Sequence, residues 1–317
     1  MVTHSIDRPL ETVRALPTSG ETRAAAPLSE ALAAEVAAHR DAVRRVLDGA
    51  DDRLLVVVGP CSVHDPVAAL DYAHRLAAAA APLAGELLVV LRAYLEKPRS
   101  VVGWKGLVHD PALDGDGDLA TGLRVGRRFL LDAAGAGLPL AAEFVDPMVA
   151  PYLADVIGYG AIGARTVASQ PHRQLASWLP MPVGCKNGVD GDVGVAVDAI
   201  RAAGVRHLFP GVADDGTPVV QRGAGNRHAH LVLRGGASGT NYDADSVAAA
   251  LARLRAADLP ARVVVDASHG NSGKDHRRQP HVVADLARQV AGGQRGLVGV
   301  MVESFLHEGR QDVAEAY

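Results

Sequence analysis

Short apolar runs recur along this chain, and the residues that follow them are of types that bind anions or metal ions. Four runs are followed at once by an arginine or a lysine, and others lead to a cysteine, a histidine or a glutamate. Guanidinium and ammonium groups bind phosphate and carboxylate, whereas sulfur, imidazole and carboxylate together suit a divalent transition metal. The cations are Arg92, Lys97, Arg165, Lys186 and Arg234, and the candidate metal ligands are Cys61, His269 and Glu303.

The elements that must position these residues alternate between strands and helices. The apolar runs are 54–58, 87–91, 139–142, 161–164, 182–185, 231–233, 263–265 and 297–302. Helical spacing is present at 66–80, 119–134, 147–157, 192–203, 244–257 and 281–291. This alternation predicts an α/β protein with a parallel sheet covered by helices. Eight strands favour a closed (β/α)8 TIM barrel, whose active site is built at the C-terminal ends of its strands.

Two parts of the chain lie outside this alternation. Residues 1–27 form a polar arm, and 28–49 have helical spacing that ends at a glycine suited to a C-cap. We therefore predict an N-terminal extension over 1–49 and a barrel over 50–317. Residues 206–222 carry two apolar runs around an Asp-Asp-Gly turn, which predicts a β-hairpin inserted before the sixth barrel strand.

Each candidate residue alone also has a purely structural interpretation. A single arginine or lysine at a strand end is usually solvated, a lone cysteine is usually a small hydrophobe, and a lone histidine is often structural. The barrel changes this assessment, because cations from several strands meet at one mouth. Their mutual repulsion and desolvation are unfavourable unless an anion lies among them. We therefore predict a ligand that carries a phosphate and a carboxylate, beside a metal that polarises a carbonyl group.

Composition excludes several other classes of protein. The net charge of −4 provides no general basic field for nucleic acid. The two cysteines, Cys61 and Cys185, indicate a reducing compartment rather than a disulfide framework. No apolar run approaches the roughly 18 residues of a membrane span, and the N-terminus has no apolar core typical of a signal peptide. We expect a cytoplasmic protein without nucleic-acid or membrane partners.

Several segments together resemble one enzyme family. They are VVVGPCSVHDP, LRAYLEKPRSVVGWKG, AAEFVDP, GAIGARTVASQPHR, VGCKNGVDG, HLVLRGG, DASHGNSGKDHRRQP and VGVMVESFLHEG. In this order, from about residue 50 to residue 311, they resemble the type I 3-deoxy-D-arabino-heptulosonate-7-phosphate (DAHP) synthases. The resemblance implies condensation of phosphoenolpyruvate with erythrose 4-phosphate, the first step of the shikimate pathway, which leads to chorismate and the aromatic amino acids.

The resemblance also implies a role for each matched residue. Phosphoenolpyruvate would be held at its phosphate by Arg165, Lys186 and Arg234, and at its carboxylate by Arg92 and Lys97 with help from Lys186. Erythrose 4-phosphate would bind the stretch Lys97, Pro98, Arg99 and Ser100, in which serine replaces the family's usual threonine. The metal, Mn2+, Fe2+, Co2+ or Zn2+, would be held by Cys61, His269 and Glu303. Lys97 would also manage a proton.

Two further features follow from the resemblance. The family has a fourth metal ligand, an aspartate in a Thr-Asp-Ala-Cys segment, followed by an eighth outer helix. We expect this chain to lack both, although Asp312 offers a substitute carboxylate. The N-terminal extension and the hairpin would bind an aromatic amino acid inhibitor, with segments closest to the tyrosine-sensitive isoenzymes. Family members form homodimers or homotetramers.

Two alternatives remain open at this point. An octulosonate-phosphate synthase would use arabinose 5-phosphate, although KPRSVVGWKG favours the four-carbon acceptor. A regulatory or scaffold subunit would keep the barrel without turnover, because fold alone does not imply activity.

Overall fold

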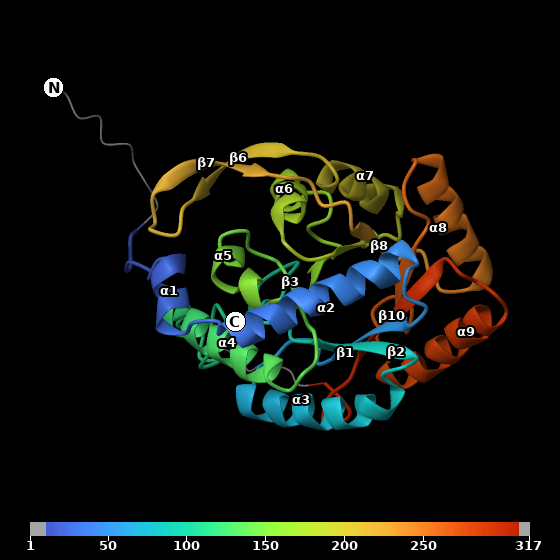
Figure 1. Cartoon of the computed structure of the whole chain (residues 1–317), viewed down its shortest axis with the longest axis horizontal. Coiled ribbons are helices and arrows are strands. Elements are labelled where there is room, and N and C mark those ends of the chain that lie inside the picture. Colours follow the sequence, from blue (N-terminus) through green and yellow to red (C-terminus); the bar gives the residue numbers. More distant parts are fainter. Residues whose placement is uncertain (1–10, 311–317) are drawn as a thin grey trace.

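Eight parallel strands close into a barrel, as the alternation of apolar runs predicts. The structure is a computed structural model that describes residues 11–310. The strands are hydrogen-bonded in the order β1-β10-β9-β8-β5-β4-β3-β2, with β1 closing the ring against β10 (Figure 1). The barrel strands are β1 (Leu54–Gly59), β2 (Leu87–Arg92), β3 (Leu140–Glu143), β4 (Tyr159–Ile162), β5 (Val183–Lys186), β8 (Ala229–Leu233), β9 (Val263–Asp266) and β10 (Leu297–Glu303).

Helices follow most of these strands and form an outer layer around the barrel (Figure 1). The longer helices of this layer are α3 (Pro66–Ala80), α4 (Leu119–Ala134), α6 (Gln170–Trp178), α7 (Gly194–Ala203), α8 (Ala244–Ala256) and α9 (Gln279–Ala291). Its short helical turns are η1 (Ala81–Leu83), α5 (Ala150–Leu153), η2 (Ala154–Val156) and η3 (His276–Arg278). Through residue 310, no helix follows β10; Asp312 lies outside the described residues.

Alternate side chains of each strand point into the barrel, where they form one apolar cluster. On β1 and β2 these are Leu55, Val57, Leu88 and Val90, which are at most 7% exposed. A second and larger cluster fills the layer between the outward faces of the strands and the helices. This period-two pattern decides which strand-end residues face the barrel axis.

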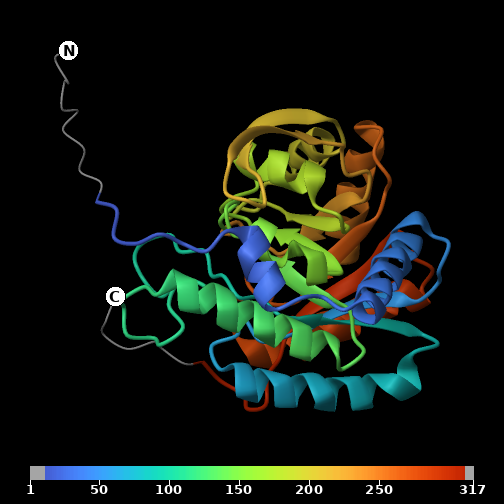
Figure 2. The ribbon, with the colours of Figure 1, turned by 60° about the vertical axis from the view of Figure 1, so that its left-hand side comes forward.

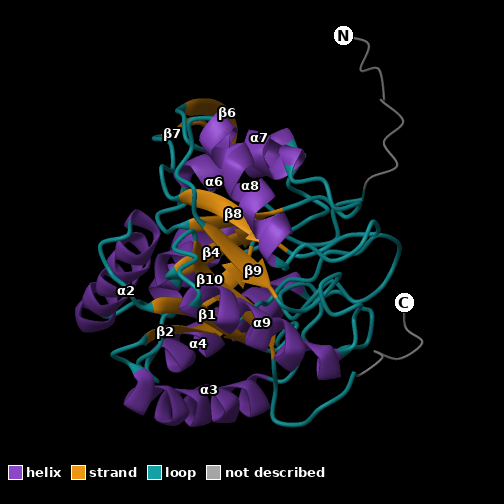
Figure 3. Cartoon of the chain, turned by 90° about the vertical axis from the view of Figure 1, so that its right-hand side faces the viewer, coloured by secondary structure: helices purple, strands orange, loops and turns teal. Residues whose placement is uncertain are grey.

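The helix α2 (Glu30–Asp48) closes the N-terminal end of the barrel. Val43, Val46 and Leu47 on one face of α2 belong to the same apolar cluster as the barrel interior. The helix begins after Ser29, whose side chain accepts a hydrogen bond from the amide of Leu32, and it ends at left-handed Gly49 (φ 73°) as predicted. Figure 3 shows α2 at one end of the strands and the long loops gathered at the other.

The hairpin is formed by β6 (His207–Val212) and β7 (Pro218–Gly223), which pair antiparallel, as predicted. It lies over one side of the molecule, and its turn meets the N-terminal segment (Figure 2). There the amide of Gly20 donates to the carbonyl of Asp214 (2.9 Å), and Arg23 forms an ion pair with the Asp214 carboxylate.

Several details of the sequence prediction were wrong. The expected arm contains a helix, α1 (Ser19–Ala25), because Thr18 and Glu21 form a capping box at its start. Helix α6 was not predicted, since it is short and has no side-chain N-cap bond. The helix expected over 147–157 is reduced to α5 and η2. Strand β4 begins two residues earlier than expected, at Tyr159, because Tyr159 and Gly160 pair with β3 and β5.

Within residues 11–310, no helix has both the length and the apolar character needed to cross a membrane.

Candidate active site

Six charged residues face the barrel axis at the C-terminal ends of the strands. Each lies two positions beyond a residue of the barrel interior, so the same strand periodicity that fills the barrel also points these groups inward. Register supports this placement, since Gly59 pairs with Glu303 and Met301 pairs with Asp266. Most of these side chains are deeply buried. They are Arg92, Glu143, Lys186, Arg234, Asp266 and Glu303.

Lys186 and Asp266 form the most buried ion pair of this end. Lys186 Nζ lies 2.9 Å from Asp266 Oδ2, and their side chains are 4% and 0% exposed. Burial alone would lower the pKa of Lys186, but the Asp266 carboxylate raises it above its usual value. Burial likewise opposes ionisation of Asp266, yet Lys186 and His269 hold its pKa well below the usual range. Both groups are therefore charged at neutral pH.

The same carboxylate orients His269. Asp266 Oδ2 lies 3.0 Å from His269 Nδ1, and Ser268 Oγ lies 2.7 Å from the same nitrogen. With Nδ1 donating to the carboxylate, Nε2 is left as the nitrogen that can bind a metal, and it lies 3.7 Å from Glu303 Oε1. The backbone of His269 is left-handed, with φ 55°. Strained conformations of this kind in residues other than glycine are concentrated at functional sites.

Arg92 connects the first strand to the last. Its Nε donates to the carbonyl of Pro60 (3.0 Å), and its Nη2 donates to the carbonyl of Cys61 (3.2 Å) and to Glu303 Oε1 (3.1 Å). The guanidinium carbon also lies 3.9 Å from the ring centre of Tyr94. Burial would raise the pKa of Glu303, but Arg92 and His269 lower it. Glu303 is thus an ionised carboxylate fixed toward the barrel mouth.

The predicted acceptor-binding stretch lies on the loop after β2. Lys97 Nζ lies 2.9 Å from Cys61 Sγ, and half-buried Pro98 follows it. Ser100 is exposed and accepts a hydrogen bond from Arg165 Nε (2.6 Å), which connects this loop to the phosphate-binding candidates. Arg99 points partly back into its own loop, where its Nε donates to the carbonyl of Trp104 (2.8 Å).

Buried Glu96 holds this loop in place. Its carboxylate accepts hydrogen bonds from the backbone amides of Val145 (3.1 Å) and Asp146 (3.0 Å) in the loop after β3. His109 Nε2 also lies 3.4 Å from it. Burial raises the pKa of Glu96. The residue directly before Lys97 is therefore tied to the neighbouring loop.

Arg165 and Arg234 bring further positive charge to the same end. Arg165 is exposed on the loop after β4, whereas Arg234 is buried at the end of β8. Burial and the charge of Arg165 both lower the pKa of Arg234, which means that the two cations are electrostatic neighbours. An anion among these side chains would relieve that repulsion.

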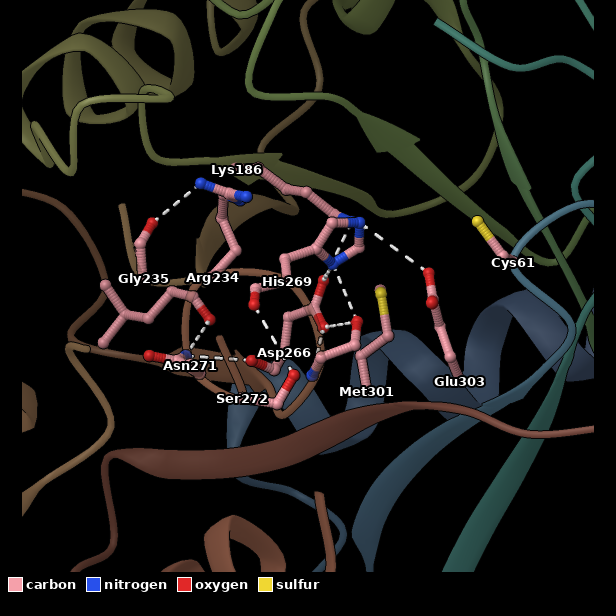
Figure 4. Close-up of polar contacts among 12 residues, drawn as sticks. Cys61, Lys186, Arg234, Gly235, Asp266, His269, Asn271, Ser272, Met301 and Glu303 are labelled. Carbon is pink, nitrogen blue, oxygen red and sulfur yellow. Dashed lines mark hydrogen bonds and ion pairs between the residues drawn. The ribbon is translucent and has the colours of Figure 1, made fainter. Parts of the chain in front are cut away.

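Two of the three predicted metal ligands lie together, and the third forms a hydrogen bond with a lysine. His269 and Glu303 face each other across 3.7 Å (Figure 4), whereas the sulfur of Cys61 accepts a hydrogen bond from Lys97. Among residues 11–310, no three His, Cys, Asp or Glu side chains gather closely enough to hold a metal ion. The donor set and the orientation of His269 nevertheless fit a transition metal, provided that Cys61 exchanges its lysine for the ion.

Sequence reasoning missed the residues that support this site. Asp266 ends a fully buried strand only three residues before His269, a position that could have marked it as an orienting group. Three asparagines join the loops after β5, β8 and β9. Asn187 Oδ1 accepts from the amide of Arg234 (2.8 Å) and from Asn241 Nδ2 (3.2 Å), and Asn271 Oδ1 accepts from the amide of Asn241 (2.8 Å). No short-range pattern marks them, because their partners are 30 to 54 residues apart in the chain.

The comparisons with known proteins agree with this geometry. The model of the DAHP synthetase I family matches residues 29–316. The chain belongs to this family. It is 50% identical over 301 residues to a phospho-2-dehydro-3-deoxyheptonate aldolase of Corynebacterium glutamicum, covering 95% of this chain and 81% of that protein. It is also 50% identical over 287 residues to the Phe-sensitive enzyme of Escherichia coli (strain K12), covering 90% and 82%.

The barrel is shared with a solved structure of the family. The phospho-2-dehydro-3-deoxyheptonate aldolase of Francisella tularensis SCHU S4 superposes with a TM-score of 0.94 at 41% identity, covering 96% of this chain and 89% of that one. Membership in the DAHP synthetase I family confirms the prediction of a transferase of aromatic amino acid biosynthesis. Enzymes of this family depend on a metal ion. The relatives named above favour neither the octulosonate nor the non-catalytic alternative.

Proposed function

We propose that the chain condenses phosphoenolpyruvate, erythrose 4-phosphate and water to 3-deoxy-D-arabino-heptulosonate 7-phosphate and phosphate at the mouth of the barrel. One observation carries the assignment of this reaction to this site. Buried cations from β2, β5 and β8 converge on the end of the barrel where His269 and Glu303 face each other. The following roles develop that proposal.

Phosphoenolpyruvate would lie among the buried cations. Lys186, Arg234 and Arg165 would bind its phosphate, with the exposed Arg165 at the entrance and the buried Lys186 below it. Arg92 and Lys97 would bind its carboxylate, with help from Lys186. Arginine suits such groups because its planar fork can donate two parallel hydrogen bonds. These contacts would place the methylene carbon of phosphoenolpyruvate toward the second substrate.

Erythrose 4-phosphate would bind the loop of Lys97, Pro98, Arg99 and Ser100. The bond from Arg165 to Ser100 supports this placement, because it joins the loop to the phosphoenolpyruvate site. Glu96 would keep the loop in position through its two bonds to the next loop. Fixing both substrates in attack geometry would supply a large part of the rate.

The metal would be held by Cys61, His269 and Glu303, and Mn2+, Fe2+, Co2+ and Zn2+ all suit this donor set. When bound, it would polarise the aldehyde carbonyl of the sugar. In the reaction, the methylene carbon of phosphoenolpyruvate attacks that aldehyde carbon, water adds to the second carbon, and the C–O bond to phosphate breaks. Lys97, between the two substrate sites, would donate a proton to the new hydroxyl group.

The N-terminal extension, residues 1–49, would serve regulation and assembly, and the barrel would carry catalysis. Contacts of α1 with the hairpin turn support an inhibitor site there for an aromatic amino acid. Relatives of this chain carry the descriptions Trp-sensitive, Phe-sensitive and Tyr-sensitive. We propose tyrosine as the inhibitor and a homodimer or homotetramer as the assembly.

A direct assay tests the reaction. Purified protein is stripped with a chelator, and the loss of phosphoenolpyruvate is followed with erythrose 4-phosphate and each of the four metals. We expect metal-dependent consumption with release of one phosphate per condensation. Arabinose 5-phosphate replaces the acceptor in a parallel reaction and should support little turnover. No consumption with any metal would support the non-catalytic alternative instead.

A further inference from the structure

One carboxylate oxygen is shared between the two halves of the site. Asp266 Oδ2 accepts from Lys186 Nζ (2.9 Å) and lies 3.0 Å from His269 Nδ1. Lys186 belongs to the proposed phosphate-binding group, and His269 to the proposed metal ligands. Figure 4 shows the Asp266 carboxylate next to the His269 ring, close to Met301 of β10. The two halves therefore meet at a single atom.

Asp266 has little freedom to move away from this position. Its other oxygen, Oδ1, accepts from both the amide (2.9 Å) and the hydroxyl (2.5 Å) of Ser268. Its backbone carbonyl accepts from Asn271 Nδ2 (2.9 Å), which also reaches the carbonyl of Leu233 (3.3 Å), directly before Arg234. The side chain is fully buried. All hydrogen-bonding positions around the carboxylate are thus occupied by named partners.

We propose that Asp266 is a positioning residue that couples metal binding to phosphoenolpyruvate binding, so that each ligand tightens the other. This inference rests on the proposed function, because it takes Lys186 and His269 as members of the two binding groups. Asp266 itself touches neither ligand.

The shared oxygen determines the sign of the coupling. When a phosphate engages Lys186, the lysine neutralises less of the Asp266 charge, and the carboxylate then polarises the His269 ring more strongly. A more electron-rich Nε2 is a better metal ligand. In the reverse direction, a metal on His269 draws the carboxylate toward Nδ1 and leaves Lys186 freer to bind phosphate. Linkage requires the two effects to be equal in factor.

The test measures binding rather than turnover. Mn2+ is titrated into metal-free protein by calorimetry, with and without saturating phosphoenolpyruvate, and the ratio of the two dissociation constants is the coupling factor. For the unaltered chain we expect a factor of about ten, within the usual range of such couplings. Phosphoenolpyruvate is titrated in the same way, with and without Mn2+, and should give the same factor.

Asp266→Asn keeps the shape of the side chain but removes its charge. Its NH2 group must also face one of the two pairs of donors, either Lys186 and His269 or the amide and hydroxyl of Ser268. We expect Mn2+ affinity to fall by about 10- to 100-fold, as for other residues that orient a metal-binding histidine. The coupling factor should fall several-fold. Direct attraction between bound phosphoenolpyruvate and Mn2+ contributes to the coupling factor in both the unaltered chain and Asp266→Asn. Only the difference between their two coupling factors therefore reports on Asp266.

Glu143→Gln is the matched control for charge. Glu143 is a buried carboxylate at the end of β3, 7% exposed; its charge helps to raise the pKa of Lys186, but within residues 11–310 it forms no hydrogen bond with Lys186 or His269. Removal of its charge should therefore lower the coupling factor clearly less than Asp266→Asn does. A factor that falls equally in Glu143→Gln and Asp266→Asn would show a general charge effect and overturn the proposal.

A second variant keeps the test decisive if Asp266→Asn does not fold, as judged by circular dichroism. Lys186→Gln removes the lysine charge from Asp266 Oδ2, which His269 then shares with no cation, so Mn2+ affinity without phosphoenolpyruvate should be equal or higher, and the coupling factor should fall. An unchanged factor in a folded Asp266→Asn or Lys186→Gln protein, or no coupling in the unaltered chain, would overturn the inference. Failure of the unaltered chain to bind phosphoenolpyruvate or Mn2+ would instead contradict the proposed function.

Discussion

At the N-terminal end of the barrel, α2 and the first residues of the strands fill the interior with apolar side chains, among them Val43, Leu47 and Leu55. At the C-terminal end, the same inward positions carry charge, including the ion pair of Lys186 with Asp266. Lys186 and Asp266 are as deeply buried as these apolar side chains. We call the N-terminal end, closed by α2, the floor of the barrel, and the C-terminal end its mouth. The difference shows that the same strand periodicity can build an apolar floor and a charged mouth in one barrel.

Polar groups at the two ends are satisfied in different ways. Near the floor, the hydroxyl of Tyr159 lies 2.9 Å from His230 Nε2, and His230 Nδ1 lies 3.0 Å from the carbonyl of His228. Since Nδ1 must donate to that carbonyl, Nε2 accepts a hydrogen bond from the tyrosine hydroxyl, and the ring is neutral. At the mouth, cations outnumber their partners and need a ligand. The floor is thus complete in itself, whereas the mouth is complete only with substrate.

The largest effect is expected from Cys61→Ala, which tests the metal at the mouth separately from the binding of anions. Cys61→Ala should lower kcat by more than about a hundredfold, because it removes a ligand of the ion that polarises the carbonyl group. Phosphoenolpyruvate binding, measured by calorimetry, should remain detectable, since the cations are separate residues. Full activity of Cys61→Ala would show that this thiol does not hold the metal.

A smaller loss is expected from the anion site. Arg234→Ala should raise the dissociation constant for phosphoenolpyruvate at least about thirtyfold, or about 2 kcal/mol, because it removes a buried charged partner. The exposed Arg165→Ala should have a weaker effect, and thermal unfolding of both variants serves as the control. Equal losses in the two variants would contradict the assignment of Arg234 to the deeper part of the site.

The floor should respond to pH rather than to ligands. Burial lowers the pKa of His230 to about 4, so the folded chain keeps this ring neutral. An unfolded chain takes up the proton near pH 6.5, so stability is full above that pH and falls as the pH drops from 6.5 to 4, by about 3 kcal/mol in total. Urea unfolding across this range measures the effect. His230→Gln, which can still accept and donate, should give a flatter pH profile.

The smallest effect tests whether the two ends are independent. Tyr159→Phe leaves His230 Nε2 without its donor, which should lower the free energy of unfolding by between about 1 and 3 kcal/mol. Neither kcat nor the KM for either substrate should change, because the hydrogen bond that the Tyr159 hydroxyl forms within residues 11–310 is to His230 and not to a residue of the mouth. A marked change in KM would mean that the floor and the mouth are linked more closely than their separate contacts indicate.

Much of this architecture could be predicted from residue order. The inward orientation of Arg92, Lys186 and Arg234 at the strand ends could be predicted, because inward positions recur every second residue along a strand. This pattern is visible in the apolar runs. The hairpin was predicted because its turn is marked by aspartates and glycine. Helix α6 escaped prediction, since it lacks a side-chain cap and spans Gln170–Trp178. Helix α1 was hidden in a segment too short to show helical periodicity.

The amino-acid sequence by itself determined the barrel, the family and the types of residue that end each strand, because these depend on local periodicity and on motifs that survive without coordinates. Only the tertiary structure decided that Lys186 and His269 share one oxygen of Asp266, and that Cys61 lies against Lys97. The bond of Lys97 to Cys61 joins residues 36 positions apart in the chain, and that of Lys186 to Asp266 joins residues 80 positions apart. They arise when closure of the barrel brings the strand ends within bonding distance, which no local pattern encodes.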